Sequence, residues 1–388
     1  MDEFNPATRP PETSQPLKHS RFKAWLAARK KLLLITVPII SLVIVLAVFW
    51  SINNNQPVSS GQIKIKTTTP TPAVKVASPL TGLLIDADTA KKPVAAVMIE
   101  NSTDARPQSG LSQAGVVYEA IAEGGITRYM ALFQEPFPSV LGPVRSVRPY
   151  YADWVSEYNV PIVHAGGSQP GLAKVNSGSF KNVEALVQAS GFYRATDRAA
   201  PHNLYTKTDL LANLLTKMKF DAAPAFTGLA RKDDKPPVAT TTPATATVPA
   251  STVPAAAAHP KINITFGIAA YNVQYDYDLA TNSYKRTNGA AATIDRNTNA
   301  QVSVKNVVVL QFPVSYSTQG NGKPETIYKL TGSGKAFFFM DGNAVVGTWS
   351  KTSDTAITTY ADANGTAITF NRGNTWISAI PTGNAVTY

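Results

Sequence analysis

The chain has 388 residues, of which 44% are hydrophobic and 16% charged, and its formal net charge is +11. This length favours two domains once tails and linkers are subtracted, and a mean hydropathy near zero excludes a protein with many membrane spans. The absence of cysteine excludes disulfides, thiolate metal sites and a cysteine nucleophile. No nucleic-acid-binding motif accompanies the positive charge, so we expect no nucleic-acid partner. A basic surface facing acidic wall or membrane polymers explains the charge equally well.

An uncharged apolar run, residues 32–52, follows three basic residues at 29–31. At about 1.5 Å per residue, a helix of this length covers roughly the 30 Å hydrocarbon core of a bilayer. No lysine or arginine follows until Lys64, so the positive-inside bias predicts that residues 1–31 form a cytoplasmic basic tail. We therefore predict a single-pass membrane protein with a signal anchor and an extracytoplasmic C-terminal part. A cleaved signal peptide is the alternative, but the run ends in AVFWS, without the small residues of a cleavage site.

Two polar tracts rich in Thr and Pro divide the remaining chain, residues 53–78 and residues 232–260. Both contain too few large apolar side chains to offset the entropy of ordering, so we predict a disordered stalk and a disordered linker. They delimit an N-terminal α/β domain at 79–231 and a mainly antiparallel, β-rich C-terminal domain at 261–388. The predicted fold class is thus mixed α/β (α+β), as a membrane-anchored two-domain ectodomain.

The predicted elements of the first domain alternate between strands and helices. In chain order they are a buried strand at 92–101, a hairpin at 115–133, a helix opened by Pro149, a strand at 160–167 and a helix at 206–219. Thr206 and Asp209 have capping-box spacing at the start of the last helix. In the second domain, residues 264–278 alternate between apolar and polar, and further strands follow, separated by Asp-Gly, Asn-Gly and Gly-Ser turns.

Gly124 and Gly125 are a two-residue hairpin signal within residues 115–133. A helix ending at Gly124 is the alternative, but the β-branched and aromatic content favours the hairpin. Such a turn would pair Ile121 with Arg128, so that Glu119, Glu123 and Arg128 would share one face. The alternative interpretation of these charges is a solvated face or a structural ion pair.

Other polar residues lie beside glycine or proline, at strand ends and turns, where binding residues concentrate. Guanidinium groups before a proline-started helix suit the capture of a carboxylate or phosphate. The arginines outnumber the nearby acids, which favours an anionic ligand over internal pairing. The candidate ligand-binding residues are Arg106, Arg128, Arg145, Arg148, His164, Ser168 and His202; the catalytic candidates at the edge of the same pocket are Glu119 and Glu123.

The four histidines lack metal-ligand spacing, and no nucleotide or dinucleotide fingerprint is present, so we expect neither a metal nor a cofactor.

Several longer strings occur in order along both predicted domains, among them SPLTGL (78–83), ARPQSGLS (105–112), VYEAIAEGGITRYMALF (117–133), GPVRSVRPYYAD (142–153), VHAGGS (163–168), PHNLY (201–205), GKAFFFMDGNAVVGTWSK (334–351) and RGNTWISAIP (372–381). Through these strings the chain resembles a bacterial family, the YerB-type surface proteins with domain of unknown function 3048 in an N-terminal and a C-terminal part.

The resemblance implies a secreted or anchored protein, in this family often a lipoprotein, without an activity that can be carried over. This chain departs from the pattern because it has no lipoprotein cysteine, and Thr293 stands where family members tend to show His before Asp295. We predict a binding module of the cell envelope that recognises an anionic or glycan ligand, such as a cell-wall polymer, or an envelope protein. The alternative is a hydrolase or transferase acting on wall polymer, with Glu119 or Glu123 as acid or base.

Overall fold

The computed structural model describes residues 42–50, 74–238, 240–242, 251–253, 256–318 and 324–388. The chain divides into two compact units, residues 1–71 and 72–388. In the first unit, residues 42–50 are helical. The predicted cytoplasmic tail, most of the predicted membrane span and most of the stalk lie outside the described residues. Within the described ranges, no helix combines the length and apolar character that crossing a membrane requires.

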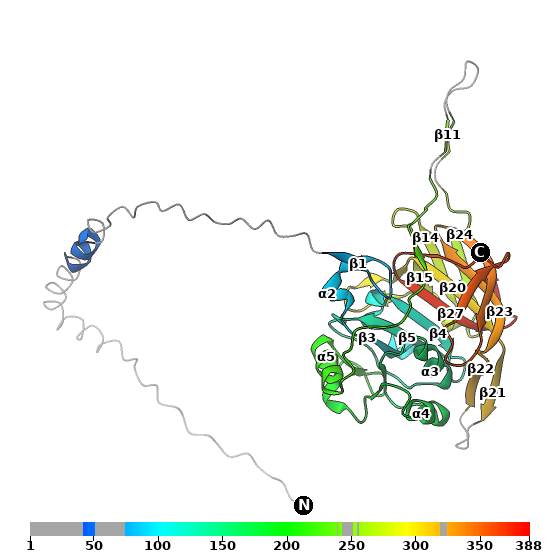
Figure 1. Ribbon diagram of the computed structural model, residues 1–388, viewed down its shortest axis with the longest axis horizontal. Coiled ribbons are helices and arrows are strands. Elements are labelled where there is room, and N and C mark those ends of the chain that lie inside the picture. Colours follow the sequence, from blue (N-terminus) through cyan, green and yellow to red (C-terminus); the bar gives the residue numbers. More distant parts are fainter. Residues whose placement is uncertain (1–41, 51–73, 239, 243–250, 254–255, 319–323) are drawn as a thin grey trace, which may run out of the picture. The chain divides into compact units, whose positions relative to one another are not determined.

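A ten-stranded mixed sheet lies at the centre of the second unit (Figure 1). Its middle strands are almost wholly apolar and buried on both faces, which is the pattern of a sheet covered on two sides. In spatial order the strands are β25 (Thr359–Asp362), β24 (Asn343–Lys351), β23 (Gly332–Met340), β20 (Asn306–Phe312), β27 (Thr375–Pro381), β4 (Val116–Ile121), β5 (Thr127–Gln134), β3 (Val94–Glu100), β6 (Ile162–His164) and β7 (Asn182–Glu184).

The two predicted domains share this sheet. Strand β27, near the C-terminus, pairs in parallel with β20 on one side and with β4 on the other. A short parallel bridge also joins β10 (Arg231–Lys232) to β26 (Phe370–Asn371). Residues 232–260 therefore do not separate two independent sheets, and the C-terminal part is mainly antiparallel, as predicted, with the parallel pair of β20 and β27 as an exception. The prediction of a mixed fold with a β-rich C-terminal part is confirmed, and the helices are few.

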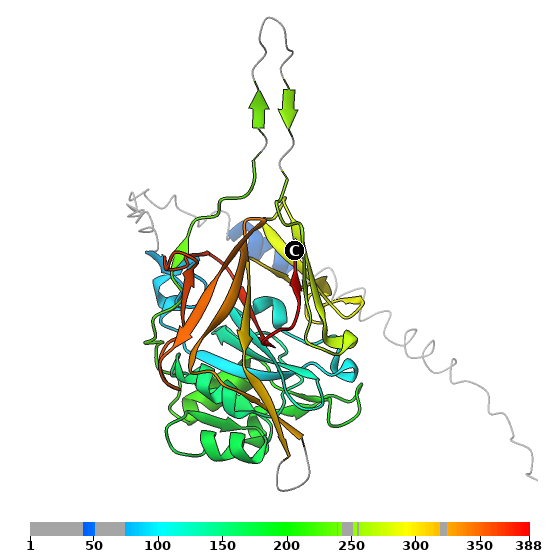
Figure 2. The ribbon, with the colours of Figure 1, turned by 90° about the vertical axis from the view of Figure 1, so that its right-hand side faces the viewer.

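One face of the large sheet is covered by helices and the other by a second sheet. The second sheet contains β16 (Ala291–Ala292), β15 (Ser283–Asn288), β14 (Val273–Asp278), β13 (Lys261–Ile264) and β28 (Val386–Thr387), with β19 (Ser303–Val304) paired to β15. These helices are α3 (Pro149–Ser156), α4 (Gln169–Val175) and α5 (Thr208–Lys217), whereas α2 (Ala87–Ala90) has no buried residue and lies against the strands at residues 75–86. Figure 2 shows most of them, in green, gathered at the lower end of the molecule.

The remaining short elements are two-stranded ribbons and single 3-10 turns. The ribbons are β1 (Lys75–Ala77) with β2 (Leu84–Asp86), β8 (Tyr193–Arg194) with β9 (Leu204–Tyr205), β11 (Thr240–Thr242) with β12 (Ser251–Val253), β17 (Ile294–Asp295) with β18 (Ala300–Gln301), and β21 (Val314–Thr318) with β22 (Pro324–Tyr328). The 3-10 turns are η1 (Thr103–Ala105), η2 (Leu111–Gln113), η3 (Ala189–Gly191) and η4 (Ala269–Tyr271).

The predicted hairpin is confirmed as β4 and β5, but its predicted register is wrong by one residue. Ile121 pairs with Thr127, not with Arg128. Gly124 and Gly125 both have positive φ, and the Ile126 amide donates to the Glu123 carbonyl as in a two-residue turn. However, it is the Ala122 amide that donates to the Ile126 carbonyl. Glu123 is thus the extra residue of a bulge, which shifts every following pair by one.

The predicted helix at 206–219 is confirmed as α5, without the predicted capping box. Lys207 is the N-cap residue and makes no side-chain capping bond. The Thr206 hydroxyl instead donates to the Gly191 carbonyl at 2.7 Å, and the Thr208 hydroxyl to the Phe137 carbonyl at 2.6 Å. These threonines therefore tie the helix start to neighbouring loops rather than to the helix itself.

Candidate functional site

The shifted register sends Glu119 and Arg128 to opposite faces of the large sheet. Glu119 lies directly opposite Tyr129, whereas Arg128 lies opposite Ala120 and, across the other strand, opposite Glu100. Directly opposed side chains share a face, and neighbouring residues alternate. The predicted cluster of Glu119, Glu123 and Arg128 on one face is therefore wrong.

Glu119 forms a fully buried ion pair with Arg286 of the smaller sheet. The Arg286 Nη2 atom lies 2.8 Å from Glu119 Oε2, and neither side chain is exposed to solvent. Thr127 donates to Glu119 Oε1 at 2.9 Å and the Trp376 indole donates to Oε2 at 3.0 Å. Arg286 Nη1 donates to Thr293 Oγ1 at 2.7 Å. Both oxygens of the carboxylate are thus engaged by three groups.

Aromatic rings enclose the Arg286 guanidinium. Its central carbon lies 4.4 Å from the centroid of the Trp376 ring and 5.5 Å from that of Tyr129, within the range of cation–π attraction. Burial lowers the pKa of Arg286, but Glu119, Tyr129 and Tyr275 together raise this pKa above its ordinary value, so Arg286 stays charged. Because Glu119 is sealed from solvent and paired, it cannot exchange protons with a substrate, and its predicted role as a catalytic acid or base is corrected to a structural one.

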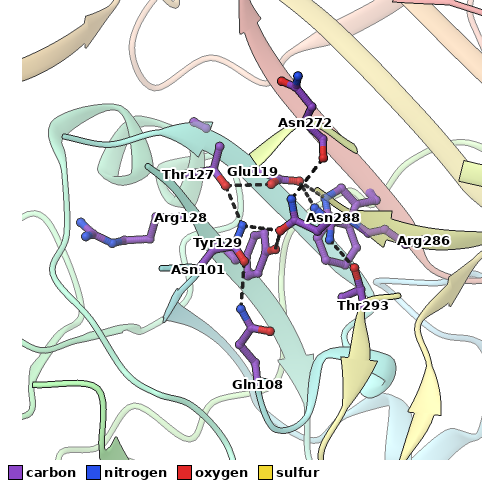
Figure 3. A network of polar contacts seen from close by, with 12 residues as sticks. Asn101, Gln108, Glu119, Thr127, Arg128, Tyr129, Asn272, Arg286, Asn288 and Thr293 are labelled. Carbon is purple, nitrogen blue, oxygen red and sulfur yellow. Dashed lines mark hydrogen bonds and ion pairs between the residues drawn. The ribbon is translucent and has the colours of Figure 1, made fainter. Parts of the chain in front are cut away.

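A polar network leads from this ion pair toward the surface (Figure 3). Asn101 Nδ2 donates to Thr127 Oγ1 at 2.7 Å and to Asn288 Oδ1 at 2.9 Å. Asn101 Oδ1 accepts from Gln108 Nε2 and from Arg106 Nε, each at 3.0 Å. In Figure 3 the Arg128 side chain points away from this network.

The network ends at a cavity of about 320 Å³ to which both halves of the chain contribute. Its walls mix amide, hydroxyl and guanidinium groups with small apolar side chains, namely Asn101, Arg106, Pro107, Gln108, Asn288, Ala291, Ala292, Thr293, Ile294 and Asn299. Arg106 Nη2 donates to the carbonyls of Asn101 and Ala270, at 3.1 and 3.0 Å, and its guanidinium lies 5.1 Å from the Tyr271 ring centroid. Arg106 therefore stands between the two halves.

On the opposite face, one carboxylate meets two guanidiniums. Glu123 Oε1 lies 2.9 Å from Arg128 Nη2, and Glu123 Oε2 pairs with Arg148 Nη2. Although partial burial raises the pKa of Glu123, the two arginines lower it to about 2. Burial lowers the pKa of Arg148, and the neighbouring Arg128 lowers it further because the two cations repel each other. Glu123 is thus ionised at physiological pH, which argues against its predicted role as a general acid.

A second ion cluster on this face contains Arg145 and His202. Arg145 Nε lies 3.1 Å from Glu100 Oε1, and His202 Nδ1 lies 3.0 Å from Glu100 Oε2. The Ser102 hydroxyl lies 2.9 Å from Glu100 Oε1 and 3.2 Å from His202 Nδ1. In a Ser–His–acid triad the serine and the acid contact different ring nitrogens. Here both contact Nδ1, so this group does not form a proton relay of that type.

His164 and Ser168 make a third set of contacts. His164 is buried at the end of β6, with Nδ1 2.9 Å from the Gly166 carbonyl and Nε2 2.7 Å from Asn182 Oδ1. Ser168 caps α4 by accepting from the Gly171 amide at 3.2 Å. Both residues thus have local structural partners.

The candidate residues therefore fall into separate contact groups rather than one. Arg106 lies at the cavity between the halves, Arg128 and Arg148 share Glu123, and Arg145 and His202 share Glu100. Among the described residues no ion pair joins these groups, although Gln108 beside Arg106 donates to the Glu100 carbonyl and Arg128 lies opposite Glu100 in the sheet. Among the described residues there is also no cluster of three or more His, Cys, Asp or Glu able to hold a metal ion.

Sequence reasoning missed several buried polar residues. Arg286 and Asn288 lie on β15, where alternation marks a face but does not distinguish a buried cation from an exposed one. Asp295 is buried and accepts from the amides of Gly110 at 2.9 Å and Ser112 at 2.8 Å. Asp295 thereby fastens the C-terminal half to the loop after Arg106.

Comparison with known proteins finds a family match for each half of the second unit. Models described as the N-terminal and C-terminal domains of "Protein of unknown function (DUF3048)" match residues 80–221 and 262–377. A protein of Bacillus subtilis strain 168 named "Putative lipoprotein YerB" is 29% identical over 325 residues, which cover 81% of this chain and 89% of the relative. A crystal structure of YerB from Bacillus subtilis matches with a TM-score of 0.68 at 27% identity, covering 81% of this chain and 100% of that one.

The buried ion pair predicts strong coupling between its two partners. The variant Arg286→Met leaves the Glu119 carboxylate buried without a counter-charge, and should lower the free energy of unfolding by about 3–5 kcal/mol in urea titrations. The double variant Glu119→Gln/Arg286→Met should lose less than the sum of the two single changes. Asp88→Asn, which breaks the exposed pair with Lys91, is the control and should change stability little. Additive losses from Glu119→Gln and Arg286→Met would contradict the coupling.

The lowered pKa of Glu123 predicts a stability difference that depends on pH. The folded-state pKa of about 2 lies below the ordinary value of 4.5, so the ionised carboxylate stabilises the fold at neutral pH. The difference in unfolding free energy between the native chain and Glu123→Gln should be constant from pH 6 to 8, measured by urea titration. It should shrink as the pH falls below about 4.5 and vanish near 2. A difference that grows toward acid pH would contradict this assignment.

Proposed function

This chain belongs to the DUF3048 family, and we propose that it is a membrane-anchored, extracytoplasmic envelope protein that binds a polar ligand between its two family regions. The name of the Bacillus subtilis relative describes a lipoprotein, which supports an envelope location. The uncharged run at 32–52 would serve as the anchor in place of a lipid-modified cysteine, which this chain lacks. The basic residues before it favour a cytoplasmic N-terminus.

The cavity at the junction of the two family regions carries the binding proposal. Ligand sites combine a concave, partly apolar wall with a few fixed polar groups. Here Asn101, Gln108 and Asn288 are held by the network behind them, so their positions are set before a ligand arrives. Arg106 Nη1 and Gln108 Oε1 form no hydrogen bond with any described residue, which leaves a cationic donor and an acceptor for the ligand.

This mixture of groups suits a glycan or an anionic wall fragment. Amide side chains bind the hydroxyl groups of a sugar as donor and acceptor together, and a guanidinium binds a carboxylate or phosphate on the same molecule. The small side chains of Ala291 and Ala292 leave room for a sugar ring at the rim.

Binding is favoured over the alternative of wall-polymer hydrolysis because neither candidate carboxylate, Glu119 or Glu123, is placed to donate a proton to a substrate. A glycoside hydrolase of the common type needs two carboxyl groups across a cleft, one of them a proton donor. Glu119 is sealed in the core and Glu123 is held ionised by two arginines, on the other face of the sheet. Neither is available as that donor.

The membrane topology can be tested in cells. We expect alkaline phosphatase fused after Tyr388 to be active, because the enzyme requires an extracytoplasmic location, and a cytoplasmic reporter at the same position to be inactive. The chain should resist extraction by high salt and dissolve in detergent, since an apolar helix of about twenty residues binds far more strongly than surface charge. Release by high salt alone, or activity of the cytoplasmic reporter, would overturn the anchor.

The cavity can be tested by filling it. The Ala292→Trp variant should lose binding of envelope polysaccharide fragments to the detergent-solubilised chain, because the indole occupies the ligand space from an exposed wall position. Arg106→Ala should weaken binding roughly tenfold or more, the value of a charge-assisted hydrogen bond. The measurement is isothermal titration calorimetry.

Two controls match these variants. Ala280→Trp adds the same ring at another exposed position, and Arg194→Ala removes an exposed arginine outside the cavity. Both should bind the fragments like the native chain. Equal binding by Ala292→Trp and Ala280→Trp would show that the ligand, if any, lies elsewhere.

A further inference from the structure

Arg128 and Arg148 form a pair of cations that converge on one position, which the side chain of Glu123 occupies. One Nη2 atom of each arginine contacts one oxygen of the Glu123 carboxylate. Among the described residues, neither arginine makes an ion pair with any other acid. A single negative charge is thus shared by two positive charges, and the three residues together carry a net charge of +1.

The two guanidiniums are held in place by groups other than Glu123. Arg128 Nη1 donates to the Ser146 carbonyl at 3.1 Å, and Arg148 Nη1 donates to the Val147 carbonyl at 2.7 Å. The side chain of Arg128 is only 3% exposed. Its Nε atom is buried and has no hydrogen-bond partner among the described residues. The fork is therefore preorganised, and one of its buried donors is unsatisfied.

Glu123, in contrast, is the movable member. Its side chain is 37% exposed, and it is the extra residue of the bulge at the β4–β5 turn. The next residue, Gly124, has positive φ, and nothing lies within 4 Å of where a side chain would start. Rotation of the Glu123 side chain into solvent requires no displacement of the packed strands. The side chains of Glu119 and Arg286, in contrast, are both fully buried.

We propose that Arg128 and Arg148 form a carboxylate-binding site that Glu123 closes from within the chain, and that the carboxylate of an incoming ligand displaces Glu123. The site takes a planar group with two oxygens, because each arginine offers one Nη2 atom to one oxygen. Displaced Glu123 enters water, where it stays ionised and unpaired. This site lies on the face of the sheet opposite the cavity, so it is independent of the function proposed for that cavity.

Competition by Glu123 determines how much the affinity for an external carboxylate should rise when the Glu123 charge is removed. If the internal carboxylate occupies the fork about nine-tenths of the time, an external carboxylate binds about tenfold more weakly than it would to an open fork. The substitution Glu123→Gln keeps the size of the side chain but removes its charge. It should therefore raise the affinity for an external carboxylate by about tenfold.

The experiment compares N-acetylglycine with N-acetylglycinamide, which has the same shape without the charge. Each probe is titrated into the full-length chain in detergent, and binding is followed by NMR of the arginine Nε–H groups. The Glu123→Gln variant should bind N-acetylglycine about tenfold more tightly than the native chain does, and should show no gain for the amide. The double variant Glu123→Gln/Arg148→Gln should lose this gain.

The proposal is wrong if the native chain and Glu123→Gln bind N-acetylglycine with equal affinity. It is also wrong if the gain in affinity persists in Glu123→Gln/Arg148→Gln, or if Glu123→Gln binds inorganic phosphate more tightly than N-acetylglycine. Circular dichroism checks that each variant is folded. If Glu123→Gln is unfolded, Glu123→Asp, whose shorter side chain reaches the fork less well, must show the same direction of change. An unchanged affinity in Glu123→Asp would then reject the site.

Discussion

The ion pair between Glu119 and Arg286 is the constraint on which the rest of the second unit depends. A charge without exposure to solvent is tolerated only with a partner in good geometry. The carboxylate comes from the N-terminal family region and the guanidinium from the C-terminal one. Either region alone would therefore bury a charge without a partner, or would leave that charge exposed to solvent. The indole of Trp376, from a third segment, completes the pair by donating to Glu119 and covering Arg286. The pair therefore couples the folding of both regions.

The same constraint organises the cavity. Thr293, which accepts a hydrogen bond from Arg286, itself lines the cavity. Thr127, which donates to Glu119, accepts a hydrogen bond from Asn101 in the cavity wall. A cavity wall that rests on a core ion pair is stiff, because its movement would break buried hydrogen bonds. Rigid polar groups lose little entropy when a ligand binds. The opposite face of the large sheet differs, because the Glu123 carboxylate there lies beside the turn formed by Gly124 and Gly125.

Local patterns predicted the elements better than they predicted their partners. The hairpin of β4 and β5, the helix α5 and the β-rich C-terminal half followed from periodicity and turn residues. The one-residue bulge at Glu123 could not be seen, because Gly-Gly fits both a regular turn and a bulged one, and the error moved Arg128 to the wrong face. The parallel pairing of β27 with β4 joins residues more than 250 positions apart, and no local signal encodes it. The pairing of Glu119 with Arg286 depends on that long-range arrangement, so it was equally hidden.

The place of β27 in the large sheet has a consequence for the order of synthesis. This strand, at residues 375–381, lies between β20 and β4. Until these residues have been synthesised, β4 presents an apolar edge with unpaired backbone groups, of the kind that invites aggregation. Completion of the sheet is therefore a late event that joins distant segments, which makes folding slow.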